Sequence, residues 1–208
     1  MIGIITTMDE QVISIKRRMN GIKQKEIAGM TFFVGTIDEK EVVVVRSQVG
    51  EVAAAVCTQI LINIFQVSYM INTGVAAGLH PDMAIGDLVV ATDIANNEKN
   101  LQLITKVQGA TKKLKGNHKL FVGHVASEDQ FVCSIKVNEE KESLFRTYCA
   151  EMEGAAIAHT CFLNKIPFVM IRTVSDTVDP NAEINFEDFV DVEARNTSRM
   201  VEELIHDL

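Results

Sequence analysis

Short apolar, β-branched runs alternate along the chain with segments whose apolar residues recur at helical spacing. This alternation is typical of an α/β fold in which helices connect the strands of a mainly parallel sheet. The expected strands cover residues 2–6, 30–37, 41–47, 68–74, 86–94, 119–128 and 167–176, the second and third forming a hairpin. The expected helices cover residues 8–20, 51–65, 98–115, 153–164 and 186–205. We therefore predict a central mixed, mainly parallel twisted sheet flanked by helices.

Length and composition favour one domain over residues 1–208. The 208 residues are 47% hydrophobic, which suffices for one sizeable core, and no linker rich in Pro, Gly or Ser divides them. Neither an apolar run of membrane-spanning length nor a signal peptide is found. Cys57, Cys133, Cys149 and Cys161 form no CxxC pair, which favours free thiols in a cytoplasmic protein.

The charge of the chain argues against nucleic acid as a partner, because the net charge is −8. Residues 112–119 are basic, but the segment is short and its surroundings are acidic. We interpret it as a solvated helix end, the alternative being a binding patch.

Candidate chemistry is sought beyond the carboxyl ends of the strands, where open α/β sheets bind ligands. These ends carry residues 6–11, 72–78, 128–132, 151–153 and 172–176. The first of them holds two acids that begin a helix, Asp9 and Glu10, and then the uncharged amide Gln11.

The segment NTGVAAGLH, residues 72–80, follows an apolar strand. Gly74 and Gly78 would allow a ligand or another backbone to approach closely. The segment is neither GxGxxG nor a P-loop, so a nucleotide-phosphate site is excluded on motif. A tight turn after the strand is the alternative.

Two further strand ends carry charged side chains beside apolar runs. In AEMEGAAIAH, Glu151 and Glu153 alternate, and either a grip on a pair of sugar hydroxyls or a stabilised helix N-terminus explains them. In IRTVSD, a buried strand ends in Arg172, Ser175 and Asp176. Asp176 fits a general acid held by Ser175, the alternative being a structural Arg–Asp pair. No His, Cys or acid cluster has metal-ligand spacing, and no metal site is expected.

These segments together resemble the purine nucleoside phosphorylase/nucleosidase superfamily, and most closely the bacterial 5′-methylthioadenosine/S-adenosylhomocysteine nucleosidases. The matching blocks run in order along the chain: IGIITTMDEQV, RSQVGEVAAA, INTGVAAGL, IGDLVV, SEDQFV, AEMEGAAIAH, PFVMIRTVSD and INFEDF. The resemblance implies hydrolysis of the N-glycosidic bond of an adenine thioribonucleoside in methionine salvage, no cofactor and a homodimer.

The resemblance also implies roles at the reacting bond. Asp176, supported by Ser175, would protonate the leaving adenine, and Glu153 would bind the ribose hydroxyls. Arg172 would position the nucleophilic water, and Gln11 stands where the family has a glutamate that activates this water.

The remaining candidate residues would line the pocket by the same resemblance. Phe131 would stack on the purine, and the backbone of Val132 would bond its edge. Met152 would pack on the sugar, and the further lining is Met8, Val49, Val75, Ala76, Glu151 and Phe186.

The chain departs from the family pattern in three places. Gln11 replaces the water-activating glutamate, and an amide can hold water but cannot take its proton. Val75 stands where the family usually has serine. The segment between residues 94 and 119 is short and lacks the residues with which the family builds its dimer interface.

Three readings of the function follow from these departures. The first is a nucleosidase whose activity is reduced, with Glu10 as a substitute base. The second is a protein that binds adenine or a nucleoside without turnover. The third is a phosphorylase, for which Arg46 is the one further basic candidate at a strand end.

Overall fold

The computed structural model describes residues 1–92, 98–114, 118–127, 147–177 and 186–208, without the side chains of 186–188 and 190–192. The strands are β1 (Ile2–Thr6), β2 (Asn20–Ile27), β3 (Met30–Ile37), β4 (Lys40–Arg46), β5 (Tyr69–Gly78), β6 (Leu88–Ala91), β7 (Leu120–Ser127), β8 (Thr147–Glu151) and β9 (Phe168–Thr177). The helices are α1 (Asp9–Lys16), α2 (Glu51–Phe65), α3 (Glu98–Thr111), α5 (Gly154–Leu163) and α6 (Phe186–His206). The described helices include none that is long and apolar enough to cross a membrane.

The described strands form one mixed sheet in the order β2-β3-β4-β1-β5-β8-β7-β6-β9. β9 also pairs with β5 in parallel along most of its length. β5 is therefore the central strand, with β1 and β9 parallel to it on either side and the end of β8 against its last two residues. The predicted α/β class with a mixed sheet is confirmed.

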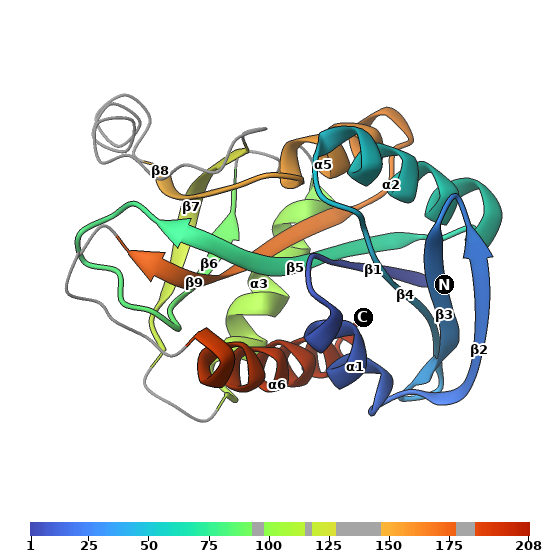
Figure 1. The fold of residues 1–208 in the computed structure, drawn as a ribbon, viewed down its shortest axis with the longest axis horizontal. Helices are drawn as coiled ribbons and strands as arrows, with labels where there is room; N and C mark the ends of the chain where they lie inside the picture. Colours follow the sequence, from blue (N-terminus) through green and yellow to red (C-terminus); the bar gives the residue numbers. More distant parts are fainter. Residues whose placement is uncertain (93–97, 115–117, 128–146, 178–185) are drawn as a thin grey trace.

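Helices cover both faces of the sheet (Figure 1). On one face α2 and α5 bury Leu61 and Ile157 against Phe32 and Met170 of the strands. On the other face α1, α3 and α6 pack on a second apolar cluster centred on β1 and β9. The strands of this core carry Val, Ile and Leu on both faces because both faces are covered.

The sequence pattern missed the strands β2 and β8 and misplaced the ends of α1 and β5. β2 was not expected, because seven of its eight residues are exposed and no apolar alternation marks this edge strand. The helix expected over 8–20 ends at Lys16, since Asn20 already belongs to β2. The strand expected over 68–74 continues to Gly78, so the glycines of 72–80 lie in β5 and not in a turn.

The register of β9 on β5 contains an irregularity that matters for the site. Ala76 pairs with Val174, but the next residue, Ala77, pairs with Asp176. Ser175 is thus the extra residue of a bulge, a device that redirects side chains at a strand end.

Gly74 illustrates how closely the first turn of the chain packs against β5. A Cβ atom at this position would lie 2.6 Å from Oγ1 of Thr7. We expect Gly74→Ala to lower the free energy of unfolding by about 1–3 kcal/mol, because the extra methyl overpacks this contact. Chemical denaturation measures the change.

Gly109→Ala is the matched control, because nothing lies within 4 Å of a Cβ atom built there. Gly109 is exposed inside α3, where alanine should stabilise the helix by about 0.5–1 kcal/mol. Equal effects of the two substitutions would contradict the packing described for Gly74.

Candidate active site

A cavity of about 290 Å³ lies at the carboxyl ends of β1, β5 and β9. Its walls also include residues at the end of β8 and the N-terminus of α5. The lining residues are Thr7, Met8, Ser47, Val49, Val75, Ala76, Ala77, Ala150, Glu151, Met152, Glu153, Ser175 and Asp176. The position follows the rule that open α/β sheets bind ligands beyond the carboxyl ends of their strands.

Most of the site residues predicted from sequence line this cavity. They are Met8, Val49, Val75, Ala76, Glu151, Met152, Glu153, Ser175 and Asp176. Gln11 and Arg172 do not line it, and both are completely buried. Phe131 and Val132 lie outside the described residues. Phe186 begins α6, and its side chain is likewise outside the described part.

Asp176 is held in the cavity by its neighbour in the sequence. The hydroxyl of Ser175 donates to Oδ1 of Asp176 over 2.6 Å. Asp176 itself is exposed. A carboxyl group with one oxygen fixed and the other open is a suitable proton donor for a bound molecule.

Glu153 lies at the N-terminus of α5, with 6% of its surface exposed. The backbone N–H of Gly50 donates to its Oε1 over 3.1 Å. Burial raises the pKa of Glu153 above its ordinary value, against the opposing effect of the Gly50 hydrogen bond. This carboxylate thus faces the cavity from a sheltered position, with one oxygen anchored to the backbone.

Glu151 has a different environment two residues earlier. Its carboxylate accepts hydrogen bonds from the N–H groups of Glu153 at 3.0 Å and Gly154 at 2.8 Å, and from the hydroxyl of Ser127. Burial alone would raise the pKa of Glu151, but the charge of Arg172 and these hydrogen bonds outweigh it and lower the pKa. Glu151 is therefore an ionised structural group that fixes the start of α5.

Arg172 is the partner of Glu151. Its Nη2 lies 2.7 Å from Oε2 of Glu151 and 2.6 Å from Oδ1 of Asn72. The exposed fractions of the two charged side chains are 0% and 2%. Arg172 thus pairs with Glu151 and not with Asp176, and its contact with the cavity runs through Glu151.

Gln11 is paired with a carboxylate that the sequence patterns did not reveal. Its Nε2 lies 3.1 Å from both carboxylate oxygens of Glu193 on α6. Burial raises the pKa of Glu193, although hydrogen bonds from Thr197, Thr173 and Gln11 lower it. One signal was available, because Glu193 shares the buried face of α6 with Thr197 and Leu204 at helical spacing.

Two residues considered for other roles, Glu10 as a substitute base and Arg46 as a phosphate ligand, do not line the cavity. Glu10 is exposed on α1 and does not line it, so the structure does not bring this substitute base to the site. Arg46, considered as a phosphate ligand, is paired with Asp9 at the surface.

Residues 1–206 match the model of the family described as the phosphorylase superfamily. The chain is 34% identical over 229 residues to the 5′-methylthioadenosine/S-adenosylhomocysteine nucleosidase of Psychromonas ingrahamii, covering 100% of this chain and 99% of the relative. The chain belongs to the nucleosidase branch of the phosphorylase superfamily. The alignment of 229 positions is longer than the 208 residues of this chain, so it contains gaps on the side of this chain.

Solved structures of nucleosidases have the same fold. The Campylobacter jejuni 5′-methylthioadenosine/S-adenosylhomocysteine nucleosidase superposes on this chain with a TM-score of 0.90 at 25% identity. The superposition covers 100% of this chain and 99% of the Campylobacter chain. The Colwellia psychrerythraea nucleosidase, solved in complex with adenine, has a TM-score of 0.87 at 31% identity, covering 100% and 95%.

We expect Arg172→Met to destabilise this superfamily member by about 3–5 kcal/mol at neutral pH, because it leaves Glu151 buried without its counter-charge. The pKa of Glu151 is lower in the folded than in the unfolded protein. The ion pair therefore stabilises the folded protein fully at pH values above the unfolded-state pKa, and this stabilisation is lost as the pH falls through the folded-state pKa. In the variant, Glu151 can take a proton in acid. The stability difference should therefore shrink from neutral pH towards about pH 4.

Arg199→Met on the exposed surface of α6 removes the same charge without a buried partner, and should change stability by less than about 0.5 kcal/mol. Urea denaturation of both variants at the two pH values measures the effects. A penalty for Arg172→Met that is constant with pH would show that Glu151 is not the ionised partner.

Proposed function

We propose that the protein hydrolyses the N-glycosidic bond of an adenine thioribonucleoside such as 5′-methylthioadenosine or S-adenosylhomocysteine. The observation that carries the proposal is that Asp176 and Glu153 line the same cavity of about 290 Å³. Asp176 is exposed and hydrogen-bonded to Ser175, whereas Glu153 is buried and hydrogen-bonded to the backbone of Gly50. Family membership and the relatives' names support this choice of substrate.

Asp176 is assigned to the leaving base. Its Oδ1 accepts from Ser175, so Oδ2 is the oxygen that would carry the proton to N7 of adenine. Protonation lets the bond between C1′ and N9 break with its electron pair going to the purine, because the base then leaves as neutral adenine. The purine itself is assigned to Phe131 for stacking and to the backbone of Val132 for hydrogen bonding.

Glu153 is assigned to the ribose. Oε1 is anchored by Gly50, and the carboxylate accepts the hydrogens of two neighbouring sugar hydroxyls. A negative charge beneath the sugar also stabilises the positive charge that develops at C1′ as the base leaves. Met152 packs against the sugar, and Met8, Val49 and Phe186 enclose its 5′ substituent.

Water completes the reaction on the face of the sugar opposite to adenine. Its oxygen forms the new bond to C1′, and the proton that it then loses returns through solvent to Asp176. An oxocarbenium-like carbon is electrophilic enough to accept neutral water, so a weakened general base slows this step without removing it. This is why Gln11 is compatible with an active, slower enzyme.

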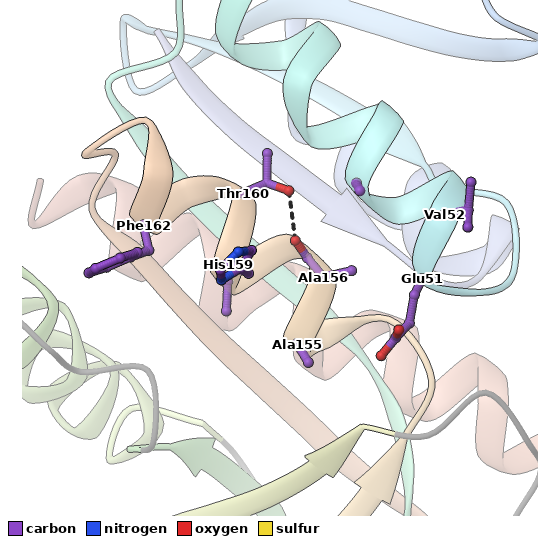
Figure 2. Close-up of a pocket in the computed structure, with 9 residues that line it drawn as sticks. Glu51, Val52, Ala155, Ala156, His159, Thr160 and Phe162 are labelled. Carbon is purple, nitrogen blue, oxygen red and sulfur yellow. Dashed lines mark hydrogen bonds between the residues drawn. The ribbon is translucent and has the colours of Figure 1, made fainter.

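We propose that the chain acts as one domain and assembles as a homodimer in the cytoplasm, in methionine salvage. A second, surface cavity of about 770 Å³ between α2 and α5 supports the dimer, because Val52 and Phe162 beside it are 82% and 62% exposed (Figure 2). The two side chains lie at opposite ends of this surface cavity, and exposed apolar surface of this kind is typical of association surfaces. Two buried thiols, Cys57 and Cys161, whose pKa burial raises to about 12, are consistent with a reducing compartment.

The release of adenine from methylthioadenosine tests the function, and Asp176→Asn tests the acid. We expect the wild-type protein to release adenine and the variant to lose about 10²–10⁴-fold in kcat, because an amide cannot donate the proton. An assay of liberated base, with and without phosphate, follows both proteins.

Asp82→Asn, at an exposed aspartate outside the cavity, is the control and should keep full activity. Tight adenine binding without base release by the wild type would leave the binding-protein reading. Release by Asp176→Asn at the wild-type rate would reject Asp176 as the acid.

Glu153→Gln should lower kcat/KM for methylthioadenosine and reduce its preference over the same substrate without the 2′-hydroxyl. A hydrogen bond to a charged group accounts for about 1.5–3 kcal/mol, which corresponds to a loss of about 10-fold to 100-fold in kcat/KM. The same substrate lacking the 2′-hydroxyl should be affected less, because it has one hydrogen bond fewer to lose. Equal losses on both substrates would place the effect of Glu153 away from the ribose hydroxyls.

A further inference from the structure

Gln11 and Glu193 form a fully buried pair between α1 and α6. Gln11 lies in the first turn of α1, three residues after Met8, which lines the cavity. The amide of Gln11 is 0% exposed and Glu193 is 2% exposed. A buried carboxylate is costly unless its environment or its task explains it.

The surroundings of Glu193 explain how it is held. Gln11 from α1, Thr173 from β9 and Thr197 from α6 all donate hydrogen bonds to it, the Thr173 bond being 2.8 Å long. The charged group that acts on it in the described part of the chain is Arg172. An environment of donors matches an ionised carboxylate, which can only accept.

This arrangement fixes the polarity of the Gln11 amide. The NH₂ end faces Glu193, so the carbonyl Oε1 must point elsewhere. Oε1 is buried, and in the described part of the chain it has no hydrogen-bond partner. A buried carbonyl of this kind needs a donor, which a water molecule or a ligand hydroxyl supplies.

We propose that Glu193 is a positioning residue that presents Gln11 to the nucleophilic water as a hydrogen-bond acceptor. The proposal rests on the proposed hydrolysis. A water molecule that donates to Oε1 has a polarised O–H bond and both lone pairs free for C1′, whereas a water that accepts from an NH₂ group has one lone pair engaged and a less nucleophilic oxygen. The orientation of one amide thus decides whether the water is oriented to attack.

Protonation of Glu193 would reverse the arrangement. A neutral carboxyl group donates through its O–H, and the amide would then turn its carbonyl inward and its NH₂ outward. Because burial raises the pKa of Glu193, we expect kcat to fall on acidification at a higher pH than an exposed glutamate would cause.

The first experiment compares Glu193→Gln with Glu202→Gln. Both remove a carboxylate from α6, but Glu202 pairs with Arg18 away from the cavity. We expect Glu193→Gln to lower kcat for methylthioadenosine by about 10-fold to 100-fold, with KM nearly unchanged, because an amide can face Gln11 with either its carbonyl or its NH₂ group and no longer fixes the Gln11 orientation. The variant should also lose the acidic limb of the pH profile, and Glu202→Gln should match the wild type in both respects.

The second experiment exchanges the two groups. Gln11→Glu alone places two carboxylates in contact, and they must share a proton. The double variant Gln11→Glu with Glu193→Gln restores one amide and one carboxylate, with the carboxylate now next to the cavity. We expect the double variant to exceed both single variants in kcat and at least to equal the wild type.

Two outcomes would overturn the proposal. Wild-type kcat and pH profile in Glu193→Gln, with or without a lower Tm, would show a purely structural role. A double variant no faster than the slower single variant would show that the two positions do not act as a pair.

NMR of the Gln11 side-chain amide separates this proposal from the proposed function, because it requires no turnover. Its signals, assigned by their loss in Gln11→Leu, should shift with pH in the wild type and Glu202→Gln but not in Glu193→Gln. Amide signals that do not respond to pH would overturn the pairing even in an active enzyme. If the Gln11 amide signals respond to pH but the wild type releases no base, the hydrolytic function and the role for water are overturned. The pairing of Gln11 with Glu193 would still stand.

Discussion

The buried ion pair between Arg172 and Glu151 joins β9, β5 and β8 to the start of α5 at one point. Arg172 comes from the middle of β9, and its Nη2 bonds both Asn72 of β5 and Glu151 of β8. Glu151 in turn binds the backbone N–H groups with which α5 begins. The wall of the cavity that carries Glu153 therefore depends on this pair. Breaking the pair would expose a charge to a low-dielectric interior, so the structure strongly specifies this arrangement.

Four acids at or behind the cavity are separated by their environments. Glu151 is kept ionised by Arg172, Glu153 is sheltered and has a raised pKa, and Asp176 is exposed and held by Ser175. Glu193 lies deepest and contacts Gln11 instead of the cavity. Environments that differ in this way let chemically similar groups serve different roles. The family resemblance predicts a carboxylate at the position of Gln11, and the structure has one in contact with Gln11, at Glu193.

Much of the architecture could be predicted because buried strands and helices have strong apolar periodicity. β1, α2 and β9 begin or end within a residue or two of their predicted limits. The exposed edge strand β2 has no such periodicity and was missed. For the glycines of β5 the sequence left close approach and a tight turn open, and the structure favours close approach, because Thr7 packs against the strand at Gly74. Spacing alone also suggested an Arg172–Asp176 pair, but the strand bulge at Ser175 and the nearby Glu151 decide the partner.

Strand ends and a family resemblance both pointed to Glu153 and Asp176, and both residues line the cavity. Glu193 could not be assigned in this way, because its role depends on α6 packing across the sheet from the first turn of α1. The catalytic and binding roles of all the site residues stay predictions, and Phe131 and Val132 lie outside the described residues.

Hydrolysis requires that water, and not phosphate, attacks the sugar. Phosphorus NMR of the protein with methylthioadenosine and excess inorganic phosphate, with released adenine assayed in the same sample, distinguishes the two nucleophiles. We expect adenine to accumulate while the phosphate signal stays unchanged. A sugar 1-phosphate that forms in step with adenine would contradict it.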